Sequence, residues 1–131
     1  MENKIILIDT NILINHFKKG SRKFEYYCLL QDKKKVKLGV SVIALFEYYS
    51  GIVTGDSKIL RMADDLFELF EIYEVNQEIA QIAAEINSKR KLQRKIELAD
   101  ILIGATALYL NARLLTENKK HFQLISGIKF A

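Results

Sequence analysis

The residues that this sequence lacks narrow its class before any motif is considered. Among its 131 residues there is one cysteine, Cys28, and there is no proline or tryptophan. A single cysteine excludes a disulfide-stabilised scaffold and is typical of a reducing compartment, where we interpret Cys28 as a small apolar core residue. No internal repeat, low-complexity tract or linker signal divides the chain. We therefore expect one domain that covers residues 1–131.

Long apolar runs are missing as well. The first such run, residues 5–8, stops at Asp9 and is too short for the core of a signal peptide. Nothing reaches the ~18 consecutive apolar residues of a transmembrane helix. The composition is nevertheless 50% hydrophobic, which supplies a core and excludes disorder as the main state. These features predict a soluble cytoplasmic protein that has no membrane partner.

Several catalytic signatures are also absent. The sequence contains no GxxxxGK[ST] phosphate loop, no GxGxxG dinucleotide motif and no GxSxG nucleophile elbow. Its two histidines, His16 and His121, stand apart from each other and from Cys28, so no zinc ligand set is present. We interpret both histidines as structural or solvated. Any catalytic chemistry has to come from other residue types.

The charge is modest but unevenly placed. Twenty Lys and Arg against sixteen Asp and Glu give a net charge of +4. Basic residues gather near positions 18–23, 33–37 and 89–95. Each cluster alone is typical of a solvated face, yet three clusters on one small domain favour a phosphate-rich partner. The residues that we expect to contact RNA phosphates are Lys18, Lys19, Arg22, Lys89, Arg90, Lys91, Arg94 and Lys95.

Apolar segments of strand and helix character alternate along the chain. Strands are predicted at residues 5–8, 36–42, 69–75, 113–116 and 128–130, and helices at 12–19, 21–30, 42–52, 56–67, 77–95 and 97–111. Alternation of this kind is typical of the α/β class. We expect a central parallel sheet of about four to five strands flanked by helices.

Three acidic residues lie in unusually apolar surroundings. Asp9 ends the first strand, Glu47 is the only charge between Lys37 and Asp56, and Asp100 is the only charge in residues 98–110. Burying an unpaired carboxylate costs several kcal/mol, whereas a shared divalent cation would satisfy all three. Oxygen ligands of this type favour Mg²⁺ or Mn²⁺. Simpler roles remain open: a helix cap for Asp9, a solvent-facing position for Glu47 and a helix-dipole partner for Asp100.

Four segments, in this order, resemble the PIN-domain ribonucleases, and within them the VapC toxins of toxin–antitoxin pairs. They are residues 5–14 (IILIDTNILI), 40–47 (VSVIALFE), 98–107 (LADILIGATA) and 114–122 (LLTENKKHF). Each segment alone is a weak signal, but the ordered set spans nearly the whole chain. The resemblance implies a single PIN-like domain.

The resemblance also implies a site and a function. Asp9, Glu47 and Asp100 match the metal-binding acids, and Asn11 and Thr116 match their polar supports. Asn118 falls where many members have a fourth catalytic Asp, and it offers an oxygen ligand without the charge. The implied activity is Mg²⁺- or Mn²⁺-dependent endoribonuclease cleavage, typically of tRNA or rRNA. The implied partners are a VapB-like antitoxin and a second copy of the chain in a homodimer.

Two other functions remain open. A PIN-fold module that binds nucleic acid or protein with little or no catalysis is one, and Asn118 is the residue that favours it. A receiver-like phosphoacceptor domain is the other. It is disfavoured because no acidic pair accompanies Asp9 and no lysine of the expected kind follows the last strand.

Overall fold

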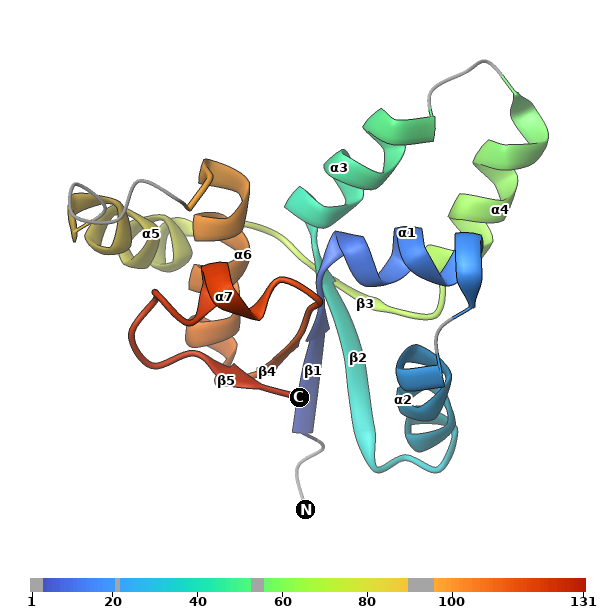
Figure 1. Ribbon diagram of the computed structural model, residues 1–131, viewed down its shortest axis with the longest axis horizontal. Coiled ribbons are helices and arrows are strands. Elements are labelled where there is room, and N and C mark those ends of the chain that lie inside the picture. The colour runs from blue at the N-terminus through green and yellow to red at the C-terminus, as the bar shows by residue number, and fades with distance from the viewer. Residues whose placement is uncertain (1–3, 21, 53–55, 90–95) are drawn as a thin grey trace.

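The computed structural model describes residues 4–20, 22–52, 56–89 and 96–131 (Figure 1). The strands are β1 (Lys4–Ile8), β2 (Val36–Ser41), β3 (Glu71–Tyr73), β4 (Arg113–Leu115) and β5 (Lys129–Phe130). The helices are α1 (Thr10–Lys19), α2 (Arg22–Asp32), α3 (Val42–Ile52), α4 (Ser57–Phe67), α5 (Gln77–Lys89), α6 (Leu98–Leu110) and α7 (Lys119–Phe122).

The five strands form one parallel sheet in the order β3-β2-β1-β4-β5. Strand β1 lies at the centre, with Leu7 opposite Gly39 of β2 and Leu114 of β4. The chain adds strands on one side of β1 as far as β3 and then crosses to the other side with β4. Ligands of open parallel sheets bind where the strand order reverses in this way, beyond the carboxyl ends of the strands. This fold confirms the predicted α/β class and places such an edge after β1 and β4.

The core forms where the helices cover the sheet. Figure 1 shows α5, α6 and α7 on one side of β1, and α1 to α4 on the other. Leu7 and Ile8 of β1 are fully buried, because a central parallel strand is covered on both faces. Helix α6 packs against α5 and α3 and buries residues around most of its circumference. No helix within the described ranges is both long and apolar enough to cross a membrane.

One predicted strand is shorter than expected. The strand predicted at 69–75 is reduced to β3, because the N–H groups of Leu69 and Phe70 donate back to the last turn of α4. The helix predicted at 77–95 is described from Gln77 to Lys89, and its predicted last residues, 90–95, lie outside the described part of the chain. Periodicity therefore located the strand but not its ends.

Local capping explains where other elements begin. Helix α1 starts at Thr10 rather than at the predicted residue 12, because Asp9 has extended backbone angles and caps the helix. Strand β2 ends at Ser41, whose hydroxyl accepts a hydrogen bond from Ile43 N–H and starts α3 as predicted.

Helix α7 was not predicted, because four residues are too few for a periodic signal.

Candidate active site

The three predicted acids meet in one cleft beyond the carboxyl end of β1. Asp9 follows β1, Glu47 lies in the middle of α3, and Asp100 lies in the first turn of α6. The cleft has a volume of about 270 Å³. Its lining consists of Asp9, Thr10, Asn11, Ile14, Glu47, Asp100 and Asn118. The fold thus gathers carboxylates that lie far apart in the sequence, and none of these lining residues is Lys or Arg.

Asp9 is the most firmly held of the acids. Its side chain is buried, and one carboxyl oxygen accepts the Thr10 N–H at 2.8 Å. The other oxygen accepts the Thr116 hydroxyl at 2.7 Å. Burial raises the pKa of Asp9 above its ordinary value, although these two hydrogen bonds act in the opposite direction. Asp9 therefore caps α1 and also presents a carboxyl group to the cleft, so its two predicted roles are compatible.

Glu47 and Asp100 complete the acidic wall. Glu47 is half-buried and accepts the Thr10 hydroxyl at 2.8 Å. The pKa of Asp100 is raised to about 6, first by burial and then by the negative charges of Asp9 and Glu47. The nearby His121 lowers the pKa of Asp100, but it does not offset the other effects. The cleft consequently concentrates negative charge that its own lining does not neutralise.

The structure places Asn11, Thr116 and Asn118 beside the three acids. Buried Thr116 donates to Asp9, and its hydroxyl oxygen accepts the Asn118 N–H at 2.9 Å. Asn11 lines the cleft and accepts the Glu117 N–H at 3.3 Å. Glu117 is not among the residues that line the cleft, and its carboxylate accepts a hydrogen bond from the Asn15 amide. The loop after β4 is thus tied to the start of α1 by several hydrogen bonds.

Carboxylate and amide oxygens in one cleft are the donor set that Mg²⁺ or Mn²⁺ prefers. A divalent cation would offset the burial, and then the mutual repulsion, that raise the pKa values of Asp9 and Asp100. Over the described ranges, no three Asp, Glu, His or Cys side chains stand in an arrangement that could already hold an ion. The residues nevertheless fit a divalent metal by the chemistry of their oxygen donors.

Comparison with known proteins identifies the fold. The family model described as PIN domain matches residues 6–127 of this chain. This chain belongs to the PIN domain family. The PIN domain is 34% identical over 136 residues to Ribonuclease VapC1 of Methanocaldococcus jannaschii, an alignment that covers 98% of this chain and 88% of that relative.

Solved structures agree with this assignment. The PIN domain is similar to a chain in the structure of VapBC-1 from nontypeable Haemophilus influenzae, with a TM-score of 0.81, 25% identity, and coverage of 97% of this chain and 96% of that one. It is also similar to a chain of DNA-bound VapBC from Salmonella typhimurium, with a TM-score of 0.85, 20% identity, and coverage of 99% and 98%. The second likeness shows the fold alone.

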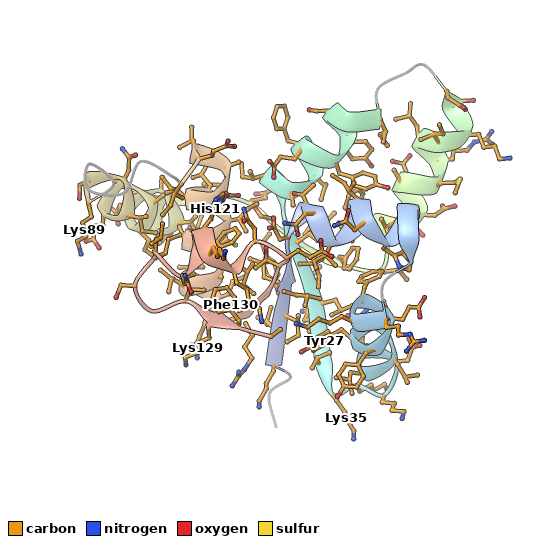
Figure 2. All side chains as sticks on the ribbon, viewed as in Figure 1. Tyr27, Lys35, Lys89, His121, Lys129 and Phe130 are labelled. Atoms are coloured by element: carbon orange, nitrogen blue, oxygen red, sulfur yellow. The ribbon has the colours of Figure 1, made fainter. Side chains whose placement is uncertain are left out.

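Two residues of this PIN domain site were not singled out from the sequence. The hydroxyl of Thr10 bonds to Glu47, and the Nδ1 atom of His121 lies 2.7 Å from the Asn118 amide nitrogen and 4.0 Å from an Asp100 oxygen. Figure 2 shows His121 projecting from α7 toward α6. Thr10 directly follows Asp9, and His121 lies three residues after Asn118. These short spacings are the only sequence features that could have linked Thr10 and His121 to the site, and neither spacing indicates a function by itself.

The predicted basic contacts of the PIN domain are only partly described. Arg22 begins α2 and Lys89 ends α5, both side chains are exposed, and neither lines the cleft. Figure 2 shows Lys89 at the outer end of α5. Lys18 and Lys19 lie in the last turn of α1. The remaining predicted contacts, Arg90, Lys91, Arg94 and Lys95, lie outside the described residues.

Proposed function

We propose that this PIN domain protein is a divalent-metal-dependent endoribonuclease, the toxin of a toxin–antitoxin pair. The observation that carries the proposal is the cleft in which Asp9, Glu47 and Asp100 meet, with no Lys or Arg among the described residues that line it. Its relative from M. jannaschii, at 34% identity, is named a ribonuclease. The raised pKa of Asp100 supports the proposal, because perturbed carboxyl groups in a cleft are typical of catalytic sites.

The mechanism assigns a task to each residue of the cleft. Asp9, Glu47 and Asp100 would hold Mg²⁺ or Mn²⁺, with Asn118 as a neutral oxygen donor. An ion held there would supply an acidified water and would stabilise charge on the phosphoryl oxygens. Thr116 fixes the rotamer of Asp9 through its hydrogen bond. Thr10 does the same for Glu47, so the carboxylates are oriented before substrate arrives.

RNA is the substrate that fits this site and the surrounding charge. Phosphodiester backbones attract Lys and Arg regardless of sequence, and we propose that the basic residues named above hold the strand. Structured tRNA or rRNA is the proposed target class, read through shape and exposed loops. Residues 1–131 would act as one nuclease domain in the cytoplasm.

A cognate antitoxin is the proposed protein partner, with the toxin itself a homodimer. The similar H. influenzae chain comes from a structure titled VapBC-1, and a Klebsiella pneumoniae chain at 28% identity comes from a toxin–antitoxin complex. A VapB-like antitoxin would neutralise this nuclease by binding to it. Size-exclusion chromatography of the toxin, alone and with the product of a neighbouring small reading frame, tests both assemblies.

A paired cleavage assay tests the nuclease itself. Purified wild type, Asp100→Asn and Asp65→Asn are incubated with total tRNA and rRNA, with Mg²⁺ or Mn²⁺ or with EDTA. Asp65 is the matched control because it is an exposed acid on α4. We expect discrete fragments from the wild type and from Asp65→Asn, and none from Asp100→Asn or with EDTA. Equal fragments from all three proteins would contradict the assignment of Asp100.

A binding module that keeps the fold without catalysis is the second candidate. Asn118 favours it, because an amide at this position removes one negative charge from the cleft. This candidate predicts RNA retention in a filter-binding assay, with no fragments under any metal condition. Calorimetry with Mn²⁺ separates the two, since an inactive module has no need of a tight ion site.

A further inference from the structure

Asn118 is held at two points beside the acidic cleft. Its backbone N–H donates to Thr116 Oγ1 at 2.9 Å. Its side-chain nitrogen Nδ2 lies 2.7 Å from Nδ1 of His121 on α7. Both the backbone N–H and the side-chain amide of Asn118 therefore have a fixed partner, while the residue still lines the cleft.

The hydrogen-bond partner of the Asn118 side-chain nitrogen determines whether the oxygen or the nitrogen of this amide faces the cleft. An Asn side chain ends in an NH₂ donor and a carbonyl acceptor, which point in different directions. When Nδ2 donates to an imidazole nitrogen, that nitrogen has to carry no proton, and the carbonyl oxygen is left to face elsewhere. Only the oxygen is a ligand for a hard cation. The same amide in the opposite orientation would present hydrogen atoms to the cleft and repel the ion.

The geometry around His121 identifies Asn118, rather than Asp100, as its hydrogen-bond partner. Nδ1 lies 4.0 Å from the nearer Asp100 oxygen, which is beyond hydrogen-bond range, and 2.7 Å from Asn118 Nδ2. The His121 side chain is 41% exposed, so it contributes little to the core. Its interactions are thus concentrated on the site.

We propose that His121 is a positioning residue that fixes the Asn118 amide so that its carbonyl oxygen faces the carboxylate cleft. The pair supplies a neutral oxygen ligand at a position that offers no fourth negative charge. This inference rests on the proposed function, because it assigns His121 to the metal site of that nuclease. His121 acts through Asn118 and does not touch the ion.

Mn²⁺ affinity measured by calorimetry tests the pair independently of catalysis. His121→Ala removes the acceptor, His121→Leu removes it while keeping bulk, and His121→Asn restores an acceptor near the position of Nδ1. Residues that hydrogen-bond to a metal ligand and hold it in place contribute about 10- to 100-fold in metal affinity. We expect a loss in that range for His121→Ala and His121→Leu, and near wild-type affinity for His121→Asn. Gln123→Ala, at the exposed end of α7, is the matched control and should bind Mn²⁺ like the wild type.

A double variant shows whether His121 acts through Asn118. Adding His121→Ala to Asn118→Ala should weaken Mn²⁺ binding no further than Asn118→Ala alone, because the amide to be oriented is gone. If the losses of Mn²⁺ affinity in the two single variants multiplied in the double variant, the inference would be overturned, and direct ligation by His121 would be indicated. Unchanged affinity in His121→Ala would overturn it as well.

Mn²⁺ binding and RNA cleavage by the wild-type protein show whether this inference fails alone or together with the proposed function. If wild-type protein binds Mn²⁺ and cleaves RNA while the His121 variants bind like the wild type, only the positioning role fails. If the wild type neither binds Mn²⁺ nor cleaves RNA, the proposed nuclease fails and the positioning role fails with it.

Discussion

At the scale of single residues, the charge of Asp100 destabilises the metal-free fold, although the proposed function requires it. The folded protein raises its pKa from the ordinary 3.8 to about 6, mainly through burial and the neighbouring acids. Below pH 3.8 the carboxyl is protonated in the folded and unfolded chains alike, so its burial costs no ionisation energy. Between pH 3.8 and about 6 the unfolded chain loses this proton while the folded chain keeps it, so the stability of the fold falls as the pH rises. Above about pH 6 the folded chain also carries the charge, and the loss of stability is complete.

Asp100→Asn should therefore stabilise the metal-free protein while abolishing cleavage. We expect a gain of about 2 kcal/mol in the free energy of unfolding at pH 8, and a much smaller gain near pH 4. Urea unfolding in EDTA at both pH values measures this difference. Equal effects at the two pH values would show that Asp100 ionises normally in the fold.

Thr116 is the second residue whose role can be tested directly. Thr116→Val keeps the shape but leaves the Asp9 carboxylate and the Asn118 N–H without their shared hydroxyl partner. Unsatisfied buried groups cost about 1–3 kcal/mol, and lost support of a metal ligand costs about 10- to 100-fold in affinity. Thermal unfolding and Mn²⁺ calorimetry should show both losses. Thr116→Ser retains the hydroxyl and should behave like the wild type.

At the scale of elements, the close contact between β2 and β3 depends on a glycine. A Cβ atom at Gly39 would lie 2.4 Å from Cε2 of the Tyr73 ring and 3.4 Å from the Glu71 carbonyl oxygen. Tyr73 therefore packs directly over the backbone of β2. The sequence predicts both strands, but it does not indicate this contact, because strand pairing is a tertiary property.

Gly39→Ala should destabilise the sheet by about 1–3 kcal/mol, since overpacking forces the Tyr73 ring to move. Gly51 of α3 provides a contrast, because a Cβ there meets nothing within 4 Å. Gly51→Ala should be neutral or stabilising by up to about 1 kcal/mol, as alanine favours a helix. Chemical denaturation of both variants tests the pair. If the two substitutions had the same effect, the contact with Tyr73 would not explain the need for glycine.

At the scale of the whole molecule, the proposed metal binding would be coupled to folding. The acidic cleft is assembled from segments around residues 9, 47 and 100, so an ion that binds there selects the folded chain. A ligand at about 100 times its Kd stabilises the native state by about 2.7 kcal/mol. We expect Mn²⁺ to raise the Tm in proportion to the logarithm of its concentration, and EDTA to reverse the rise. In Asp100→Asn the rise should be largely lost, whereas a rise that persists would locate the ion elsewhere.

The sequence by itself determined the class of the fold and the positions of the acids. Alternating apolar segments report which faces are buried, and this local signal is enough to predict a parallel α/β sheet. Glu47 and Asp100 were found because an isolated charge in an apolar helix contradicts its surroundings. Asp9 was found because it follows a buried strand at the sheet edge where ligands bind.

Only the tertiary structure decided which side chains form hydrogen bonds with one another in the site. Thr116 reaches Asp9 across 107 positions, and Thr10 reaches Glu47 across 37. His121 gained its contact with Asn118 from the short helix α7, which carries no periodic signal. Hydrogen bonds of this kind depend on rotamers and on packing between distant elements, and local patterning records neither. The sequence therefore fixes which residues are buried, and the fold selects their hydrogen-bond partners.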